Sequence, residues 1–232
     1  MKNANLKPKI ITLSGEPGAG KTTVLKKLKE LYEEKGVLVE THLVGQTFRQ
    51  LADKLGVSVS ELNKQAALRP EIDRMLDDEL KNYSQKINSN PSPNTIYIID
   101  SRMAWKFVNN SFSIRLTVPS TEAGKRIFSD STRSQADQYS CIEDAVLATE
   151  IRKQNEIKRY KRLYGADLSD INNYQLVVNT EKARPEEIAK LISVCANLHR
   201  AGKFFPKIWQ GNDVSVIPSK IQPKKISEEM QR

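Results

Sequence analysis

The sequence predicts an α/β fold of three layers, in which helices cover both faces of a mainly parallel sheet of five strands. Short apolar runs, typical of buried strands, alternate along the chain with longer segments whose apolar residues recur at helical spacing. The run at residues 95–99 is almost continuously apolar, as expected for a strand in the middle of a parallel sheet. This alternation favours parallel strand pairs joined by right-handed crossovers.

The first strand is expected at residues 9–13, where a β-branched run leads into a glycine-rich turn. A helix follows over residues 24–32, and Gly36 offers a C-terminal stop. The later elements continue the same alternation. Further strands are predicted at 37–41, 95–99, 112–118 and 174–179, and further helices at 46–55, 70–87, 121–129, 140–165 and from residue 185 onward.

The turn after the first strand carries the most specific motif in the chain. It reads Gly-x-x-x-x-Gly-Lys-Thr between a strand and a helix, which is the P-loop pattern in its required context. Backbone amides and the helix N-terminus hold phosphate oxygens in such a loop, while Lys21 bridges the terminal phosphates and Thr22 joins the coordination of Mg²⁺. The motif predicts a P-loop NTPase fold and a phosphotransferase that uses ATP and Mg²⁺. The residues expected to contact the ATP phosphates are Gly15, Glu16, Pro17, Gly18, Ala19, Gly20, Lys21, Thr22 and Thr23.

Two charged residues follow the strand at 95–99. Asp100 ends this strand, where P-loop proteins place an acid that supports Mg²⁺ through a bound water; a helix-capping or solvated aspartate is the alternative. Arg102 lies near the carboxyl ends of the strands, where parallel α/β proteins bind ligands. An arginine there can hold a phosphate with two donors, and a surface arginine without a role is the alternative.

A long basic helix is expected between Ser140, which has capping-box spacing to Glu143, and Gly165. On this helix Arg152, Glu156 and Arg159 share one face at spacings of four and three. Such a face is either solvated or part of a lid, a helix that closes over the site and brings arginines to the transferred phosphoryl group. Lys21, Arg126, Arg152 and Arg159 are the catalytic candidates.

Composition and charge restrict the partners. The formal net charge is +9, of which residues 197–232 contribute +4, from seven basic and three acidic residues. No aromatic and basic residues interleave in an RNA-binding pattern, so nucleic acid is not expected as a partner. No apolar run reaches eighteen residues and residues 1–9 lack a signal-peptide core, so a cytoplasmic protein without a membrane span is expected. The cysteines and histidines stand apart, which favours neither a disulfide nor a zinc site.

From about residue 9 to residue 196 the chain resembles the cytidylate kinase-like members of the nucleoside monophosphate kinases, especially the short archaeal-type form. The resemblance covers the P-loop and several segments in the same order. These segments are Gly45-Gln46-Thr47-Phe48-Arg49, Leu51-Ala52, Pro70-Glu71-Ile72-Asp73, Asp100-Ser101-Arg102-Met103-Ala104-Trp105, Lys158-Arg159-Tyr160-Lys161, Leu163-Tyr164-Gly165 and 174–180.

The resemblance implies an adenylate kinase-like fold and transfer of phosphate from ATP to a nucleoside monophosphate, with CMP or dCMP as the favoured acceptor. It implies that Arg49, Asp73 and Arg102 bind the acceptor, that Arg152 and Arg159 belong to the lid, and that Thr22 and Asp100 serve the metal ion. The catalytic domain is expected at residues 1–202, with acceptor-binding helices at about 45–87 and the lid helix at about 130–165. Residues 203–232 are expected to form a basic extension of unknown role.

Two other functions remain open on the sequence alone. A kinase of another small molecule could use the same scaffold, because the fold does not fix the acceptor. A nucleotide-dependent regulatory ATPase is the alternative from a different class. A GTPase is not favoured, because the chain lacks an Asn-Lys-x-Asp segment and has Asp100-Ser101-Arg102-Met103 in place of an Asp-x-x-Gly switch.

Overall fold

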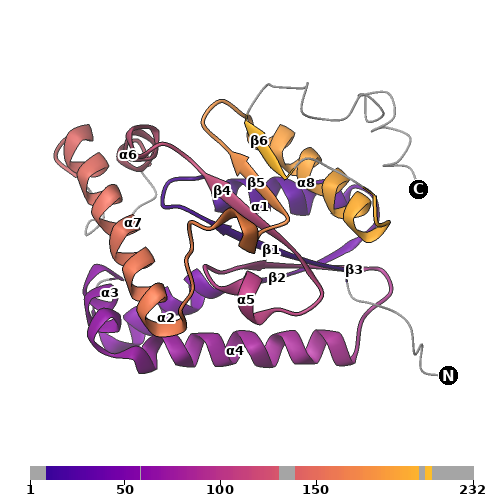
Figure 1. Ribbon diagram of the computed structural model, residues 1–232, viewed down its shortest axis with the longest axis horizontal. Helices are drawn as coiled ribbons and strands as arrows, with labels where there is room; N and C mark the ends of the chain where they lie inside the picture. The colour runs from indigo at the N-terminus through magenta and orange to yellow at the C-terminus, as the bar shows by residue number, and fades with distance from the viewer. Residues whose placement is uncertain (1–8, 58, 131–138, 204–206, 211–232) are drawn as a thin grey trace.

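The computed structural model describes residues 9–57, 59–130, 139–203 and 207–210. Its centre is a sheet of six parallel strands in the order β2-β3-β1-β4-β5-β6, with helices on both faces (Figure 1). The strands are β1 (Lys9–Gly15), β2 (Leu38–Leu43), β3 (Thr95–Asp100), β4 (Ser111–Thr117), β5 (Leu176–Asn179) and β6 (Ile208–Gln210). The strand order confirms the three-layer α/β fold and places β1, with its phosphate loop, between β3 and β4.

Alternate side chains of the central strands point to opposite faces, and both faces are buried. On one face, Leu13 and Ile98 belong to the large core cluster that α1 and α8 cover. On the other face, Ile10 and Ile99 pack with Leu80 of α4 in a smaller cluster. Burial on both faces explains why the strands lack a polar alternation in the sequence.

The helices vary widely in length. Their bounds are α1 (Lys21–Glu33), α2 (Val44–Leu55), α3 (Val59–Leu68), α4 (Pro70–Ser89), α5 (Ala104–Phe107), α6 (Ser120–Phe128), α7 (Ile142–Tyr164) and α8 (Pro185–Arg200), with a 3-10 turn η2 (Ile171–Asn173) before β5. Within the described residues, no helix is both long and apolar enough to cross a membrane.

Helices α2, α3, α6 and α7 gather at one end of the sheet (Figure 1). This is the end at which the strands finish, because α2 follows β2 directly and α6 follows β4 closely. Helices α6 and α7 pack tightly: a Cβ on Gly124 would lie 2.7 Å from the Cα of Val146. Gly165, with φ of 61°, ends α7 as its sequence predicts. The long helix therefore crosses the edge of the sheet at which parallel α/β proteins bind ligands.

Helix α5 was not predicted from the sequence, and one strand and one helix start also differ from the prediction. The sheet has a sixth strand, β6, which pairs with β5 and buries Trp209 to 7% exposure. Three residues are too few to show a strand period, so this strand was not predicted. Helix α7 begins at Ile142 after Cys141, with no side-chain cap, so the capping box predicted at Ser140 is not formed. Residues 131–138 of the predicted lid segment, and 204–206 and 211–232 of the predicted extension, lie outside the described residues.

Candidate active site

The phosphate loop joins β1 to α1 and takes its shape from two glycines. Gly18 and Gly20 have φ of 73° and 74°, a left-handed conformation that favours glycine. A Cβ on Gly18 would lie 2.8 Å from the Cα of Ala123, so Gly18 also allows the loop to pack on α6. A Cβ on Gly20 would meet nothing within 4 Å. An open loop at a helix N-terminus fits a bound phosphate group.

Lys21, the first residue of α1, folds back over the loop. Its Nζ donates to the carbonyl oxygen of Gly15 at 3.1 Å. Burial and the nearby charge of Arg102 lower the pKa of Lys21 to about 7, against the opposing charges of Asp100 and Glu156. A phosphate in the loop would supply the negative charge that favours the ammonium form. The site thus holds a lysine that gains its full charge when an anion binds.

Helix α7 meets the end of β3 through a shared carboxylate. The Nε of Arg102 donates to Glu156 Oε2 at 2.7 Å, and its Nη2 donates to Oε1 at 3.3 Å. The Nε of Arg152 donates to the same Oε1 at 3.1 Å. Burial favours the protonated carboxyl, but the charges of Arg102 and Arg152 outweigh it and lower the pKa of Glu156 to about 2. Glu156 is therefore an anion between two predicted phosphate-binding arginines.

A second ion-pair group joins α7 to the phosphate loop itself. Glu16 accepts from Nη2 of Arg115 at 2.8 Å and from the backbone nitrogen of Val118 at 3.3 Å. Lys153 of α7 lies 3.3 Å from the same carboxylate. The side chains of Glu16 and Arg115 are only 10% and 8% exposed. Glu16 thus links the phosphate loop, β4 and α7 through its side chain.

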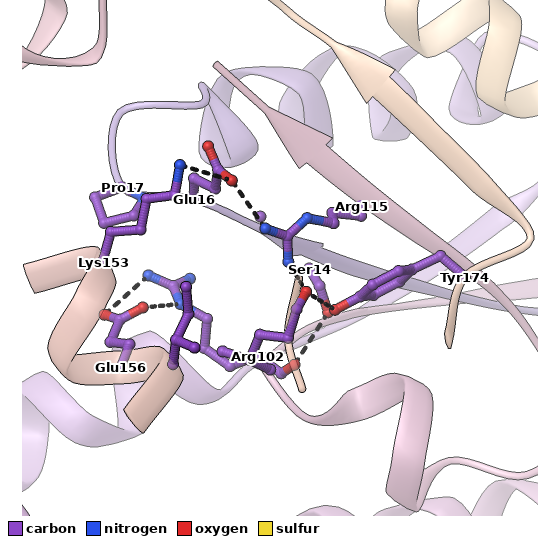
Figure 2. A pocket seen from close by; sticks show the side chains of 11 residues that line it. Ser14, Glu16, Pro17, Arg102, Arg115, Lys153, Glu156 and Tyr174 are labelled. Atoms are coloured by element: carbon purple, nitrogen blue, oxygen red, sulfur yellow. Dashed lines mark hydrogen bonds and ion pairs between the residues drawn. The ribbon is translucent and has the colours of Figure 1, made fainter. Parts of the chain in front are cut away.

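These two groups face each other across a pocket beside the phosphate loop (Figure 2). The pocket is lined by three cations, Arg102, Arg115 and Lys153, and by two carboxylates, Glu16 and Glu156. Tyr174 and Leu168 close another part of its wall. The charged lining carries a net charge of +1, to which Lys21 and Arg152 add nearby. An excess of positive charge in a partly buried pocket attracts phosphate anions.

A third contact joins α7 to α4. Arg159 Nε lies 3.4 Å from Oδ2 of Asp73, although this oxygen accepts no hydrogen bond from any residue in the described ranges. Burial raises the pKa of Asp73, opposed by the charge of Arg159. One turn further along α4, Tyr164 donates to Asp77, and burial raises the pKa of Asp77 to about 6. A buried acidic surface of α4 therefore faces the C-terminal half of α7.

Comparisons with known proteins agree with this geometry. A family of AAA domains matches residues 11–148, which is more than half of the chain. A cytidylate kinase of Pyrococcus horikoshii is 33% identical over 79% of this chain and 85% of its own length, and one of Methanocella arvoryzae is 32% identical over 79% and 94%. The chain belongs to the cytidylate kinase-like family. It is thus a P-loop nucleotide kinase by descent, and the predicted family is confirmed.

The fold comparison points the same way. The solved structure of a shikimate kinase from Bacteroides thetaiotaomicron has a TM-score of 0.50 and 14% identity, and the match covers 82% of this chain and 98% of that chain. At this identity the likeness shows the fold alone. The cytidylate kinase-like chain therefore shares its fold with this shikimate kinase.

The structure brings together part of the predicted site of this cytidylate kinase-like chain. Lys21, Arg102 and Arg152 converge around Glu156, as described above, and Arg159 lies beside Asp73. Arg49 is exposed on α2, and no hydrogen bond or ion pair joins it to another described residue. The predicted acceptor role of Arg49 stays a prediction.

Arg126 is placed apart from the other catalytic candidates. Its guanidinium binds Glu122 on its own helix, and it donates to Thr180 and to the backbone oxygen of Glu181 after β5. These contacts fix Arg126 to the loop between β5 and α8 rather than to the group around Glu156. A catalytic role for Arg126 stays a prediction.

The predicted metal residues provide oxygen donors next to the phosphate loop. Thr22 is exposed on the first turn of α1, and Asp100 is half-buried at the end of β3, in register with Leu13 of β1. Within the described ranges, neither side chain makes a hydrogen bond or ion pair. A hydroxyl and a carboxylate fit Mg²⁺, which takes oxygen ligands and is usually held by one or two carboxylates together with substrate phosphates.

Arg115 and Lys153 were missed by the sequence analysis. Arg115 interrupts the apolar strand β4, and a charged residue inside a buried strand was the available signal. Lys153 lies three residues before Glu156 on α7 and so shares its face, which was a weaker signal. In both cases the partner is Glu16, which lies 99 residues before Arg115 and 137 residues before Lys153, so no local spacing indicates it.

Proposed function

We propose that the protein transfers phosphate from ATP, with Mg²⁺, to a nucleoside monophosphate, with CMP or dCMP as the acceptor. One observation carries this proposal: Arg102 from the end of β3 and Arg152 from α7 meet on Glu156, close to Lys21 of the phosphate loop. Three cations from separate elements are thus gathered beside a site shaped for a nucleoside triphosphate. The cytidylate kinase names of the archaeal relatives support the choice of acceptor.

Each residue has a role that follows from its place. The loop amides and Lys21 hold the ATP phosphates, and Thr22 and Asp100 support Mg²⁺, which neutralises phosphate charge when bound. Arg102, with Arg49 and Asp73, binds the acceptor, while Arg152 and Arg159 belong to the lid helix α7. Phosphoryl transfer needs positioning and charge stabilisation rather than a protein nucleophile, and the cations described here suit that need. Residues 1–202 hold all the residues given a role in this proposal, β6 (Ile208–Gln210) completes the sheet beyond them, and the enzyme works in the cytoplasm.

The acceptor test measures ADP release with ATP, Mg²⁺ and a panel of CMP, dCMP, UMP, AMP, GMP and shikimate. We expect turnover that depends on the monophosphate, with kcat/KM at least about tenfold higher for CMP or dCMP than for the others. Equal ATP hydrolysis with and without every acceptor would instead indicate a regulatory ATPase. Turnover with shikimate alone would indicate a kinase of another small molecule.

A further inference from the structure

The carboxylate of Glu156 is shared by two arginines that come from different parts of the chain. We propose that Glu156 is a positioning residue, which fixes Arg102 and Arg152 by one edge of each guanidinium and leaves their remaining donors free for substrate phosphates. This inference rests on the proposed function, because it concerns the phosphates that the two arginines would bind. Glu156 itself does not touch substrate in this arrangement.

The hydrogen bonds show which edges are engaged. Arg102 uses Nε and Nη2, which is the side of its guanidinium, and Arg152 uses Nε alone. Within the described residues, no other hydrogen bond engages Nη1 of Arg102 or either Nη atom of Arg152. A guanidinium has five N–H donors in a rigid plane. Fixing the Nε edge therefore sets the direction of the plane and leaves most of its donors for a phosphate, which two of them can hold as a fork.

Burial and opposite charge stabilise the contact between Glu156 and the two arginines. The side chains of Glu156 and Arg102 are 11% and 20% exposed, so the pair is largely shielded from water. The carboxylate balances one of the two guanidinium charges, and the group keeps a net charge of +1 toward the pocket. Without Glu156, Arg102 and Arg152 would repel each other and Lys21. Glu156 thus allows two guanidinium groups to share one small site with Lys21 before any phosphate arrives.

Helix α7 is held in register on both sides of Glu156. Lys153, one turn before it, lies 3.3 Å from Glu16 of the phosphate loop. Arg162, further along the helix, donates to the backbone oxygen of Ala67 in α3 at 2.7 Å. These contacts fix the position of α7, and with it the position of the Glu156 carboxylate relative to Arg102. The carboxylate therefore acts from a supported helix rather than from a free surface.

A competing explanation is that Glu156 only occupies the place of an absent phosphate. In that case the carboxylate would compete with substrate, and its removal would strengthen acceptor binding. Positioning predicts the opposite result, because arginines released from Glu156 lose their orientation. The two explanations therefore differ in the sign of one measured quantity, the affinity for CMP.

The test compares Glu156→Gln and Glu156→Asp with Glu150→Gln as a matched control. Glu150 lies on the same helix, and its carboxylate contacts Ser120 and Gln154 rather than any arginine. For each protein we would measure the kcat and KM with CMP, the affinity for CMP by calorimetry, and the affinity for a non-hydrolysable ATP analogue. Thermal melting establishes that each variant is folded.

We expect Glu156→Gln to lower kcat/KM for CMP at least about thirtyfold and to weaken CMP binding, while affinity for the ATP analogue changes less than threefold. Glu156→Asp keeps the charge but is one methylene shorter, so it should restore little of the loss. Glu150→Gln should behave as wild type. If Glu156→Gln does not fold, the same measurements on Glu156→Asp decide the question.

Three results would overturn the inference: unchanged kinetics in Glu156→Gln, tighter CMP binding in that variant, or full recovery in Glu156→Asp. Failure of the proposed function looks different. A wild-type protein that binds CMP without phosphorylating it would contradict the proposed reaction, and weaker CMP binding by Glu156→Gln would still support positioning. A wild-type protein that does not bind CMP would overturn both.

Discussion

The phosphate loop and the interface of α7 with the sheet meet in one pocket but are built in different ways. The loop is a continuous segment whose shape depends on Gly18 and Gly20, and its lysine is held by the backbone oxygen of Gly15. The interface is assembled from side chains far apart in the sequence, such as Lys153 of α7 with Glu16 and Glu156 of α7 with Arg102. The loop holds its lysine at a low pKa, whereas the interface pairs its charges.

This difference separates function from stability. A lysine whose pKa is lowered to about 7 is less favourable in its charged form when the protein is folded than when it is unfolded. A buried ion pair, by contrast, leaves an uncompensated charge when one partner is removed. Substitution of Lys21 should therefore reduce activity without reducing stability, and substitution of a buried paired charge should reduce stability as well.

The largest expected effect is that of Lys21→Met. Loss of the charged contact to the transferring phosphate should lower kcat about a thousandfold, which corresponds to roughly 4 kcal/mol. The melting temperature of the ligand-free protein should not fall, because a disfavoured ammonium is removed. Steady-state kinetics and calorimetric melting measure the two quantities. A folded variant with normal turnover would contradict the proposed role of Lys21 in phosphoryl transfer.

The next effect is on stability. Glu16→Gln leaves Arg115 buried without its carboxylate partner, and we expect the free energy of unfolding to fall by about 3 kcal/mol. Glu122→Gln is the control, because Glu122 and Arg126 form a more exposed pair at 3.0 Å, for which about 0–1 kcal/mol is expected. Urea unfolding at pH 7 gives both values. Equal decreases in the free energy of unfolding would mean that the buried pair of Glu16 and Arg115 contributes no more to stability than the more exposed pair of Glu122 and Arg126.

The third effect distinguishes two arginines with the same proposed substrate. Arg49→Met and Arg102→Met should each lower kcat/KM for CMP at least about a hundredfold, because each removes a charged contact to the acceptor phosphate. Only Arg102→Met should also lower the melting temperature, since it leaves Glu156 with one partner fewer. Affinity for an ATP analogue should change little in both variants. Weaker ATP binding with intact CMP binding would assign these arginines to the other substrate.

The smallest effect concerns the α4 side of the interface and depends on pH. Burial raises the pKa of Asp77 to about 6, with Tyr164, Asp73, Lys81 and Asp78 as its charged or titratable neighbours. The folded protein therefore keeps this proton when the unfolded chain, with an ordinary pKa near 4, has lost it. The contribution of Asp77 to stability falls as pH rises from about 4 to about 6.

Asp77→Asn removes this dependence. Relative to wild type, the variant should gain stability as pH rises through the same window, which urea unfolding at pH 4.5 and pH 6.5 would show. Parallel changes in the two proteins would mean that Asp77 does not titrate differently in the folded state. Asn keeps an oxygen that can accept from Tyr164, so the comparison isolates the charge.

The same contrast explains what the sequence could predict. The phosphate loop, its flanking strand and helix, and five of the six strands follow from local spacing, which requires no knowledge of distant residues. The partners of Glu16 could not be predicted in this way, because Arg115 lies 99 residues further along the chain. The placement of Arg126 on the loop after β5 also depends on tertiary packing. The shared helix face of Arg152, Glu156 and Arg159 was recognised from the sequence. The sequence did not indicate that Glu156 pairs with Arg102 after β3, or that Arg159 lies beside Asp73 of α4.

Strand β6 has a consequence for how the chain is made. Trp209 lies in the same core cluster as Leu13, so β1 and β6, the first and last strands of the described residues, share one packed interior. A ribosome releases the N-terminal part first, and β5 emerges with an open hydrogen-bonding edge until β6 follows. An open edge is a template for pairing with another nascent chain. Any shortened form of the protein should therefore extend at least to Gln210, and a ribosome that pauses before this point would leave a chain prone to aggregate.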